Sequence, residues 1–345
     1  MAKPLLSFVI PCYRSANTIG AVVRELNDTL AARADEYDHE IILVNDGSPD
    51  DTADAIRELC ARDPAIVFVD LSRNFGQHSA VMAGFHQVRG DIVICLDDDG
   101  QTPACECFKL IDKVAEGYDI VFAQYPRRRQ SALRNLGSRF NAACNHYFFG
   151  QPKELTVNSY YACRRFVVDT ALQYPNPFPY VTGLLFQSVS RYANVPVEHR
   201  ARTEGRSGYN LKKLMALWLN GVTAFSIKPL RFASYAGWLT AAAGAVFALA
   251  TVIRKLVNPD IPAGWASTIS VLLLLGGMII ALIGVVGEYI GRIYLSINRS
   301  PQFVVRSVTR GAAEGIHQPE EREMNADEDH ACGLGASKPG RGRLR

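Results

Sequence analysis

The stretch DIVICLDDDGQTP, residues 91–103, joins an apolar run directly to three consecutive carboxylates. Its first half is rich in Val and Ile and almost continuously apolar, which is typical of a strand covered on both faces of a sheet. Pro103 stands where a first-turn residue of a following helix belongs. The stretch therefore predicts a buried strand that ends in acidic side chains and leads into a helix.

Four more apolar runs of this kind lie in the first third of the chain, at residues 5–11, 40–46, 65–72 and 118–124. Between the runs, helical periodicity begins near Ser15, Asp50, Gln77 and Pro103. Alternation of buried strands with helices predicts an α/β fold with a doubly wound, mostly parallel sheet. Ligands of such sheets bind at the carboxyl ends of the strands, where the aspartates of residues 97–99 stand.

The second half of the chain is much more apolar than the first. Residues 209–231 fit an amphipathic juxtamembrane helix with lysines at one end. Residues 232–253 and 263–286 contain no charged side chain, and each stretch reaches the roughly 20 residues that cross a bilayer. We therefore expect a transmembrane hairpin over residues 232–297, with helices at about 232–256 and 264–292. A buried helical hairpin of a soluble protein is the alternative, which these lengths disfavour.

The hairpin divides the chain into an α/β domain at residues 1–208 and a tail at residues 298–345, which we expect to be disordered after about residue 310 because it lacks apolar periodicity. Basic residues on both sides of the hairpin predict, by the positive-inside rule, that the α/β domain and both termini are cytoplasmic. They are Lys212, Lys213, Lys228 and Arg231 before it, and Arg292, Arg299, Arg306 and Arg310 after it. The expected location is a bacterial-type inner membrane.

Charge and cysteine usage exclude several classes of protein. The net charge of +3 is too small to indicate a nucleic-acid partner. The eight cysteines show neither CxxC pairs nor the spacing of a disulfide framework, which favours a reducing compartment. Cys105 and Cys107 have no His or Cys partner at zinc spacing.

Three neighbouring carboxylates repel one another unless water or a cation offsets their charge. In an extended chain Asp97 and Asp99 lie on one side and Asp98 points elsewhere. Two carboxylates at the end of a strand can hold Mg²⁺ or Mn²⁺ and leave coordination positions for substrate phosphates and water. A solvated acidic turn is the alternative interpretation of so short a motif.

Two further segments bring ligand-binding side chains to the same sheet edge. VIPCYRS at residues 9–15 supplies Tyr13, which can stack on a base, and VNDGSPDD at residues 44–51 supplies Asp46, which can accept hydrogen bonds from a base or ribose. Neither segment contains GxGxxG or GxxxxGK[ST]. A nucleotide site without a glycine-rich phosphate cradle needs a metal to hold the phosphates.

These segments, together with LSRNFGQHSAVMAGF, LDDDGQTP and GEYIGRIY, resemble the family 2 glycosyltransferases with a GT-A fold. More narrowly, the chain is similar to the polyprenyl-phosphate group, which contains dolichol-phosphate mannose synthase and the undecaprenyl-phosphate aminoarabinose transferases. The resemblance extends from about residue 6 to residue 310. It implies an inverting transferase that moves a sugar from a nucleotide-sugar, with UDP expected, to undecaprenyl or another polyprenyl phosphate at the cytoplasmic face of the membrane.

The resemblance also implies roles for particular residues. Asp97, Asp99 and Gln101 would surround the metal, and Asp97, Asp99 and Arg202 would be catalytic. Arg128 and Arg134, from a basic cluster, would hold the acceptor phosphate. The nucleotide-sugar would contact Pro11, Tyr13, Ser15, Asp46, Asp97, Asp98, Arg202 and Ser207.

Two departures from the family pattern bear on mechanism. Many relatives carry Asn-Glu after the tyrosine, where this chain has Arg14 and Ser15. Relatives also often carry an aspartate, proposed as a base, in the segment that here contains Asn158 and Ser159. A lipid phosphate has a second pKa of about 6, so it is largely dianionic at neutral pH and needs positioning more than deprotonation.

Two other functions fit parts of the sequence. A processive polysaccharide synthase would share the front domain, but QSVSRY at residues 187–192 lacks the spacing and the tryptophan of QxxRW. A non-catalytic membrane scaffold with a relic nucleotide site would explain the two departures. Small residues around Gly276 and Gly284 leave a homo-oligomer open.

Overall fold

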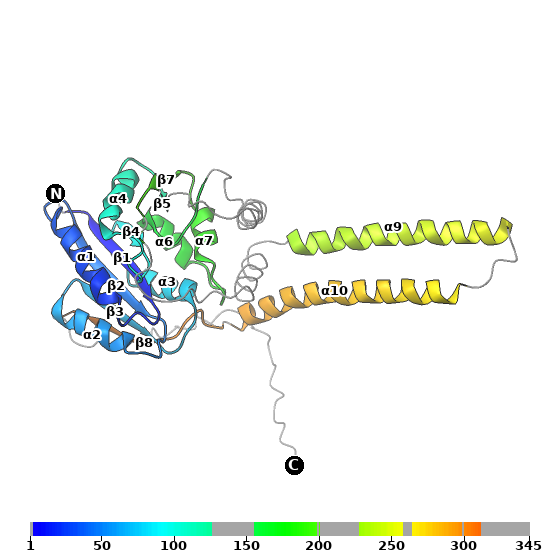
Figure 1. Cartoon of the computed structure of the whole chain (residues 1–345), viewed down its shortest axis with the longest axis horizontal. Helices are drawn as coiled ribbons and strands as arrows, with labels where there is room; N and C mark the ends of the chain where they lie inside the picture. The colour runs from blue at the N-terminus through cyan, green and yellow to red at the C-terminus, as the bar shows by residue number, and fades with distance from the viewer. Residues whose placement is uncertain are drawn as a thin grey trace, which may run out of the picture.

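The computed structural model describes residues 3–125, 155–198, 200, 228–257, 264–298 and 300–311. In Figure 1 an α/β unit lies at one end and two long helices extend from it. The strands are β1 (Leu5–Cys12), β2 (Asp38–Asn45), β3 (Ile66–Leu71), β4 (Ile92–Cys95), β5 (Ile120–Gln124), β6 (Tyr161–Arg164), β7 (Tyr192–Pro196) and β8 (Val305–Arg310). The helices are α1 (Ile19–Ala31), α2 (Thr52–Arg62), α3 (Gln77–Phe85), the short η1 (Ala104–Glu106), α4 (Cys107–Ala115), α6 (Arg165–Leu172), α7 (Val181–Gln187), α9 (Lys228–Val257) and α10 (Trp265–Ile297).

The described strands form one mixed sheet in the order β7-β5-β6-β4-β1-β2-β3-β8. β1 pairs in parallel with β2 and β4, β2 with β3, and β5 with β7. β6 is antiparallel to both β4 and β5, so those two strands point the same way. The mostly parallel sheet is therefore confirmed, and the carboxyl ends of β1 to β5 meet at one edge.

Burial on both faces explains why the predicted strands read as continuous apolar runs. In β1, Phe8 and Ile10 pack into one core cluster and Val9 into the other, because successive side chains of a strand point to opposite faces. Helices α1, α2 and α4 supply the first cluster, and α3, α6 and α7 supply the second. The sheet is thus a central layer with helices on both sides (Figure 1).

The run NVPVEH at residues 194–199 also predicts a strand and overlaps β7, so two strands of the sheet, β6 and β8, were not predicted from the sequence. β6 lies between β4 and β5, and β8 forms one edge of the sheet by pairing antiparallel with β3. β8 belongs to residues 305–310, which follow the hairpin, so the sheet includes a strand from beyond the expected domain limit at residue 208. The chain leaves the α/β unit before α9 and returns to it after α10.

Helices α9 and α10 run side by side away from the sheet (Figure 1). They approach closely at Gly237, where an added methyl group would lie 3.6 Å from Leu282 Cδ1. Within the described part of the chain, one segment, Leu274–Ile297, is long and apolar enough to cross a membrane by length and composition. Near its end, Ser296 Oγ donates to Asn176 Oδ1, and Gln302 Nε2 donates to the Tyr174 carbonyl at 2.6 Å. These bonds fix the base of α10 to the α6–α7 connection.

Most of the expected amphipathic helix at residues 209–231, and the tail beyond residue 311, lie outside the described residues. An added Cβ at Gly276, Gly277, Gly284 or Gly287 would meet no described atom within 4 Å. A homo-oligomer through this part of α10 stays a prediction.

Candidate active site

The triplet lies in a turn at the carboxyl edge of the sheet, because β4 ends at Cys95. Asp97 is surrounded by donors from two other elements: Gln77 Nε2, at the start of α3, donates to Asp97 Oδ1 at 3.1 Å, and Ser159 Oγ, just before β6, donates to Oδ2. The pKa of Asp97 is raised to about 6: burial raises it most and the nearby charges of Asp99 and Asp98 add to this, while the bonds from Ser159 and Gln77 oppose the shift. A cation beside Asp97 would stabilise the charged form of this carboxylate.

Asp98 points toward the β1–α1 loop and not toward Gln77 and Ser159. Its Oδ2 atom accepts hydrogen bonds from the Tyr13 amide at 3.1 Å and from Ser15 Oγ. The expected separation of Asp98 from Asp97 is therefore present, although a turn produces it and not strand alternation. Ser15 is buried, so the structure gives it the role of holding Asp98. Its direct contact with a nucleotide-sugar stays a prediction.

Asp99 Oδ1 accepts a hydrogen bond from the Gln101 amide at 3.1 Å, which closes the turn. The described residues contain no group of three or more His, Cys, Asp or Glu side chains that could hold a metal. Mg²⁺ in phosphate-transfer sites is commonly held by one or two carboxylates, with phosphate oxygens and water completing the coordination. Asp97 and Asp99, with Gln101 beside them, fit that mode of binding.

Tyr13 is 44% exposed at the same edge, as a residue that stacks on a base must be. The next residue, Arg14, adopts a φ of +59°, a left-handed conformation that costs a non-glycine residue energy and persists only where neighbours enforce it. Its amide donates to Ser48 Oγ at 3.2 Å, and its guanidinium lies 5.5 Å from the centre of the Tyr13 ring. Contacts between the β1–α1 and β2–α2 loops thus fix the position of Tyr13.

Asp46 has a structural role that the sequence did not reveal. It is 3% exposed, and its carboxylate accepts the Phe75 amide at 2.7 Å and the Gly76 amide at 2.9 Å. Burial raises the pKa of this carboxyl group, while the two amide bonds lower it. Asp46 therefore fastens the β3–α3 loop to the β2–α2 loop, and its contact with the nucleoside stays a prediction.

A cavity of about 300 Å³ opens beside Asp97 on the α3 and α7 side of the sheet. Burial lowers the pKa of His78, one of the residues that line the cavity, to about 4. The His78 ring packs edge-on against the Tyr180 ring, with 5.1 Å between the two ring centres. His78 is therefore neutral at pH 7, in keeping with the packing role typical of such a histidine. The polar lining residues are Gln77, His78, Asp97, Asn158, Ser159, Tyr161, Tyr180 and Thr182, and Pro11 lies among the apolar ones.

Sequence reasoning did not include Gln77 and Ser159 among the site residues. The signal for Gln77 was its position at the start of a predicted helix that follows a strand, the place where side chains face the carboxyl edge. Ser159 stood in the segment where relatives often carry a proposed base, but β6 was not predicted, so its place beside Asp97 was not foreseen. Four expected site residues, Arg128, Arg134, Arg202 and Ser207, lie outside the described residues.

Comparison with known proteins shows the family of the chain. A family model described as glycosyl transferase family 2 matches residues 7–168, and one described as the GtrB C-terminal hairpin matches residues 228–293. The undecaprenyl-phosphate 4-deoxy-4-formamido-L-arabinose transferase of Pseudomonas fluorescens (strain SBW25) is 34% identical over 318 residues, 88% of this chain and 90% of that protein. The chain belongs to the family 2 glycosyl transferases.

Two further relatives also match most of the chain. The transferase of the same name from Edwardsiella ictaluri (strain 93-146) is 32% identical and covers 92% of this chain and 97% of that protein. An uncharacterized glycosyltransferase, YkcC of Bacillus subtilis (strain 168), is 30% identical, with 87% and 93% covered. Among solved structures, glucosyl-3-phosphoglycerate synthase of Mycobacterium tuberculosis matches with a TM-score of 0.48 and 22% identity, over 64% of this chain and 79% of that one.

Proposed function

We propose that this glycosyltransferase moves a sugar from a UDP-sugar to undecaprenyl phosphate, or a closely related polyprenyl phosphate, at the cytoplasmic face of the membrane. The observation that carries the proposal is the cluster of Asp97, Asp98 and Asp99 beside a polar cavity, in a chain that continues into the helical hairpin. The acceptor is inferred from the names of the relatives, since those from Pseudomonas and Edwardsiella are undecaprenyl-phosphate transferases.

The chemistry requires one displacement at the sugar carbon that carries the diphosphate. An oxygen of the lipid phosphate forms the new bond to that carbon, the bond to the diphosphate oxygen breaks, and the electron pair leaves with the nucleoside diphosphate, which inverts the configuration. Asp97 and Asp99, with Gln101, would hold Mg²⁺ or Mn²⁺, which when bound supplies positive charge to the departing diphosphate. Tyr13 would stack on the base, and Asp98 would fix the loop that presents Tyr13.

Apart from Asp97, which is assigned to the metal, the described lining of the cavity offers no strong general base, and this favours a phosphate as the acceptor. Asn158 is occupied by backbone partners: its amide donates to the Ala123 carbonyl, and its oxygen accepts the Tyr160 amide at 3.0 Å. His78 is a weak base, with a pKa of about 4. A sugar hydroxyl would need a proton acceptor here, whereas a phosphate dianion does not.

We place the transferred sugar in the cavity beside Asp97. Thr182→Phe, at the start of α7, would fill part of that cavity. Transfer should fall on the order of tenfold or more, because the sugar carbon and the acceptor would no longer align. UDP affinity should be retained, since Tyr13 and Asp46 lie on other loops. Thr170→Phe, on the exposed side of α6, is the control, and equal transfer by both variants would exclude this placement.

The function is tested with the full chain in detergent, MnCl₂, undecaprenyl phosphate and a panel of labelled UDP- and GDP-sugars. We expect a single labelled lipid with a UDP-sugar. A polymeric product would indicate a processive polysaccharide synthase. No labelled lipid and no donor hydrolysis with any sugar would favour a non-catalytic scaffold.

We propose that the hairpin crosses the membrane twice and leaves both ends of the chain in the cytoplasm. The support is topological: β8, after the hairpin, pairs with β3, before it, so the chain crosses the bilayer an even number of times. Alkaline phosphatase fused after residue 260 should be active, because that point is external, whereas a fusion after residue 345 should be inactive. Activity of the second fusion would contradict this arrangement.

A further inference from the structure

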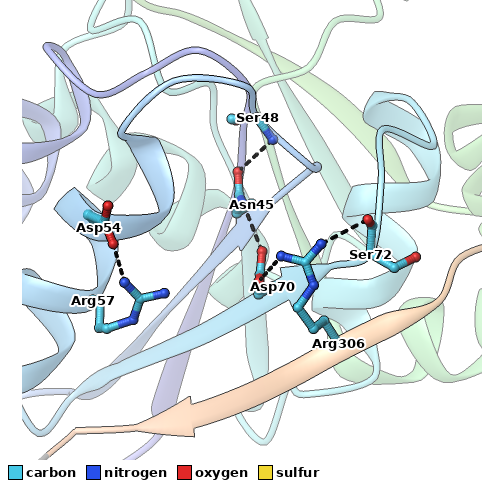
Figure 2. Close-up of polar contacts among 7 residues, drawn as sticks. All are labelled: Asn45, Ser48, Asp54, Arg57, Asp70, Ser72 and Arg306. Atoms are coloured by element: carbon cyan, nitrogen blue, oxygen red, sulfur yellow. Dashed lines mark hydrogen bonds and ion pairs between the residues drawn. The ribbon is translucent and has the colours of Figure 1, made fainter.

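Arg306, in β8, reaches across to the carboxyl end of β3 (Figure 2). One guanidinium nitrogen lies 3.2 Å from Asp70 Oδ2, and the other donates to the Ser72 carbonyl at 3.0 Å. Asp70 is 4% exposed, whereas the Arg306 side chain is 62% exposed. The arginine therefore neutralises a buried carboxylate and also holds the first residue after the strand.

A β-bulge directs Arg306 toward this position. In the antiparallel ladder Asp70 faces Ser307 and Leu71 faces Val305, so Arg306 is an extra residue that faces no partner in the pairing. Such bulges are frequent beside active sites, where they turn a side chain out of its regular direction. Here the irregularity brings the guanidinium to the edge of the sheet that carries the nucleotide loops.

From Asp70 a chain of hydrogen bonds leads to the strained residue beside Tyr13. Asn45 Nδ2 donates to Asp70 Oδ1 at 2.8 Å, and Asn45 Oδ1 accepts the Ser48 amide at 3.1 Å (Figure 2). Ser48 Oγ in turn accepts the Arg14 amide. Asn45 and Asp70 are both buried, so their orientation depends on these partners and little on water.

From Ser72 a second connection leads to Asp46. Ser72 begins the β3–α3 loop, whose amides at Phe75 and Gly76 bind the Asp46 carboxylate. The same loop packs so tightly on Gly47 that an added Cβ would lie 2.2 Å from the Arg73 carbonyl carbon. The β2–α2 and β3–α3 loops flank the expected nucleoside site. Both are thus connected by hydrogen bonds or chain continuity to Asp70 or Ser72, the two residues that Arg306 contacts.

We propose that Arg306 is a positioning residue for the nucleoside diphosphate donor: from the strand that follows the membrane hairpin, it sets the loops that carry Tyr13 and Asp46. This inference rests on the proposed function for the identity of the ligand. It adds a link between the hairpin and the donor site, because β8 begins shortly after α10 ends at Ile297.

The test compares full-length Arg306→Gln with wild type, with UDP and MnCl₂ titrated by calorimetry and donor kinetics measured under acceptor saturation. We expect UDP affinity to fall on the order of tenfold and the donor KM to rise equally, with kcat at saturating donor nearly unchanged. Arg306→Lys should give an intermediate affinity, because one ammonium group cannot bridge Asp70 and Ser72 as a guanidinium does. A purely structural role would lower the unfolding temperature and the active fraction and leave UDP affinity unchanged.

Arg57→Gln is the matched control, because Arg57 also pairs with an aspartate, Asp54, but on the exposed side of α2 (Figure 2). Wild-type UDP affinity and donor KM in Arg306→Gln would overturn the inference. If that variant does not fold, Asp70→Asn breaks the same ion pair, and an unchanged UDP affinity there would be equally decisive.

The outcomes also separate this inference from the proposed function. A wild type that binds UDP but transfers no sugar would contradict the function alone, while the comparison of affinities would still decide the role of Arg306. Wild-type protein that binds neither UDP nor GDP would overturn both.

Discussion

Asp99→Asn is expected to reduce sugar transfer on the order of a thousandfold, since one removed group that stabilises developing charge commonly costs that much in rate. The substitution keeps the size of the side chain and can keep an oxygen near the Gln101 amide, but it removes the negative charge that a divalent cation requires. The departing diphosphate would then lack its neutralising partner. The measurement is labelled lipid formed at saturating donor, together with UDP affinity at several MnCl₂ concentrations.

The control for Asp99→Asn is Asp54→Asn, which removes an exposed carboxylate from α2. We expect this variant to transfer sugar at the wild-type rate. Near-normal turnover in Asp99→Asn, or UDP affinity that still rises with MnCl₂ as in the wild type, would place the cation site elsewhere.

Of the substitutions proposed for this protein, Gly47→Ala is expected to lower the free energy of unfolding most. Gly47 has a φ of +57°, and a Cβ there would lie 2.2 Å from the Arg73 carbonyl carbon and 2.5 Å from the Asn74 nitrogen. Because both are backbone atoms, the whole β3–α3 loop has to move. We expect a loss of about 3 kcal/mol from strain and overpacking together, with weaker UDP binding in the protein that remains folded.

Gly76→Ala tests the effect of conformational strain without overpacking. Gly76 has a φ of +92° and a ψ of 157°, a region that only glycine adopts readily, but an added Cβ would meet nothing within 4 Å, so conformational strain alone should cost about 1 to 3 kcal/mol. Thermal unfolding of the full chain in one detergent ranks the two variants. An equal or larger effect at Gly76 would show that the contact of Gly47 with the β3–α3 loop is unimportant.

The strands predicted from the sequence are the ones that local pattern determines. β1 and β2 are covered on both faces, so burial alone makes them continuously apolar. β8 is an edge strand whose partner, β3, lies more than two hundred residues earlier. A short, half-buried strand after a helical hairpin has no local feature that distinguishes it from a tail, which explains why it was not predicted.

The residues of the candidate site were likewise predicted only where a local pattern marks them. The triplet at residues 97–99 was identified because acidic residues directly after an apolar run are a local signal. The partners of Asp97 were not, because Ser159 comes near it only when β6 inserts between β4 and β5, and Gln77 only when α3 packs on the sheet. The role of Asp46 in joining two loops depends likewise on the packing of loops that are remote in sequence.

The return of β8 to the sheet also sets an order for synthesis. A ribosome makes β3 long before residues 305–310, and the two helices of the hairpin are made between them. Until the last strand emerges, β3 is an open sheet edge, and Asp70 has no arginine beside it from β8. A nascent chain that stops before or within the hairpin therefore cannot complete the sheet, so the carboxyl end of β3 gains its last contacts only in a protein whose helical hairpin has already been made.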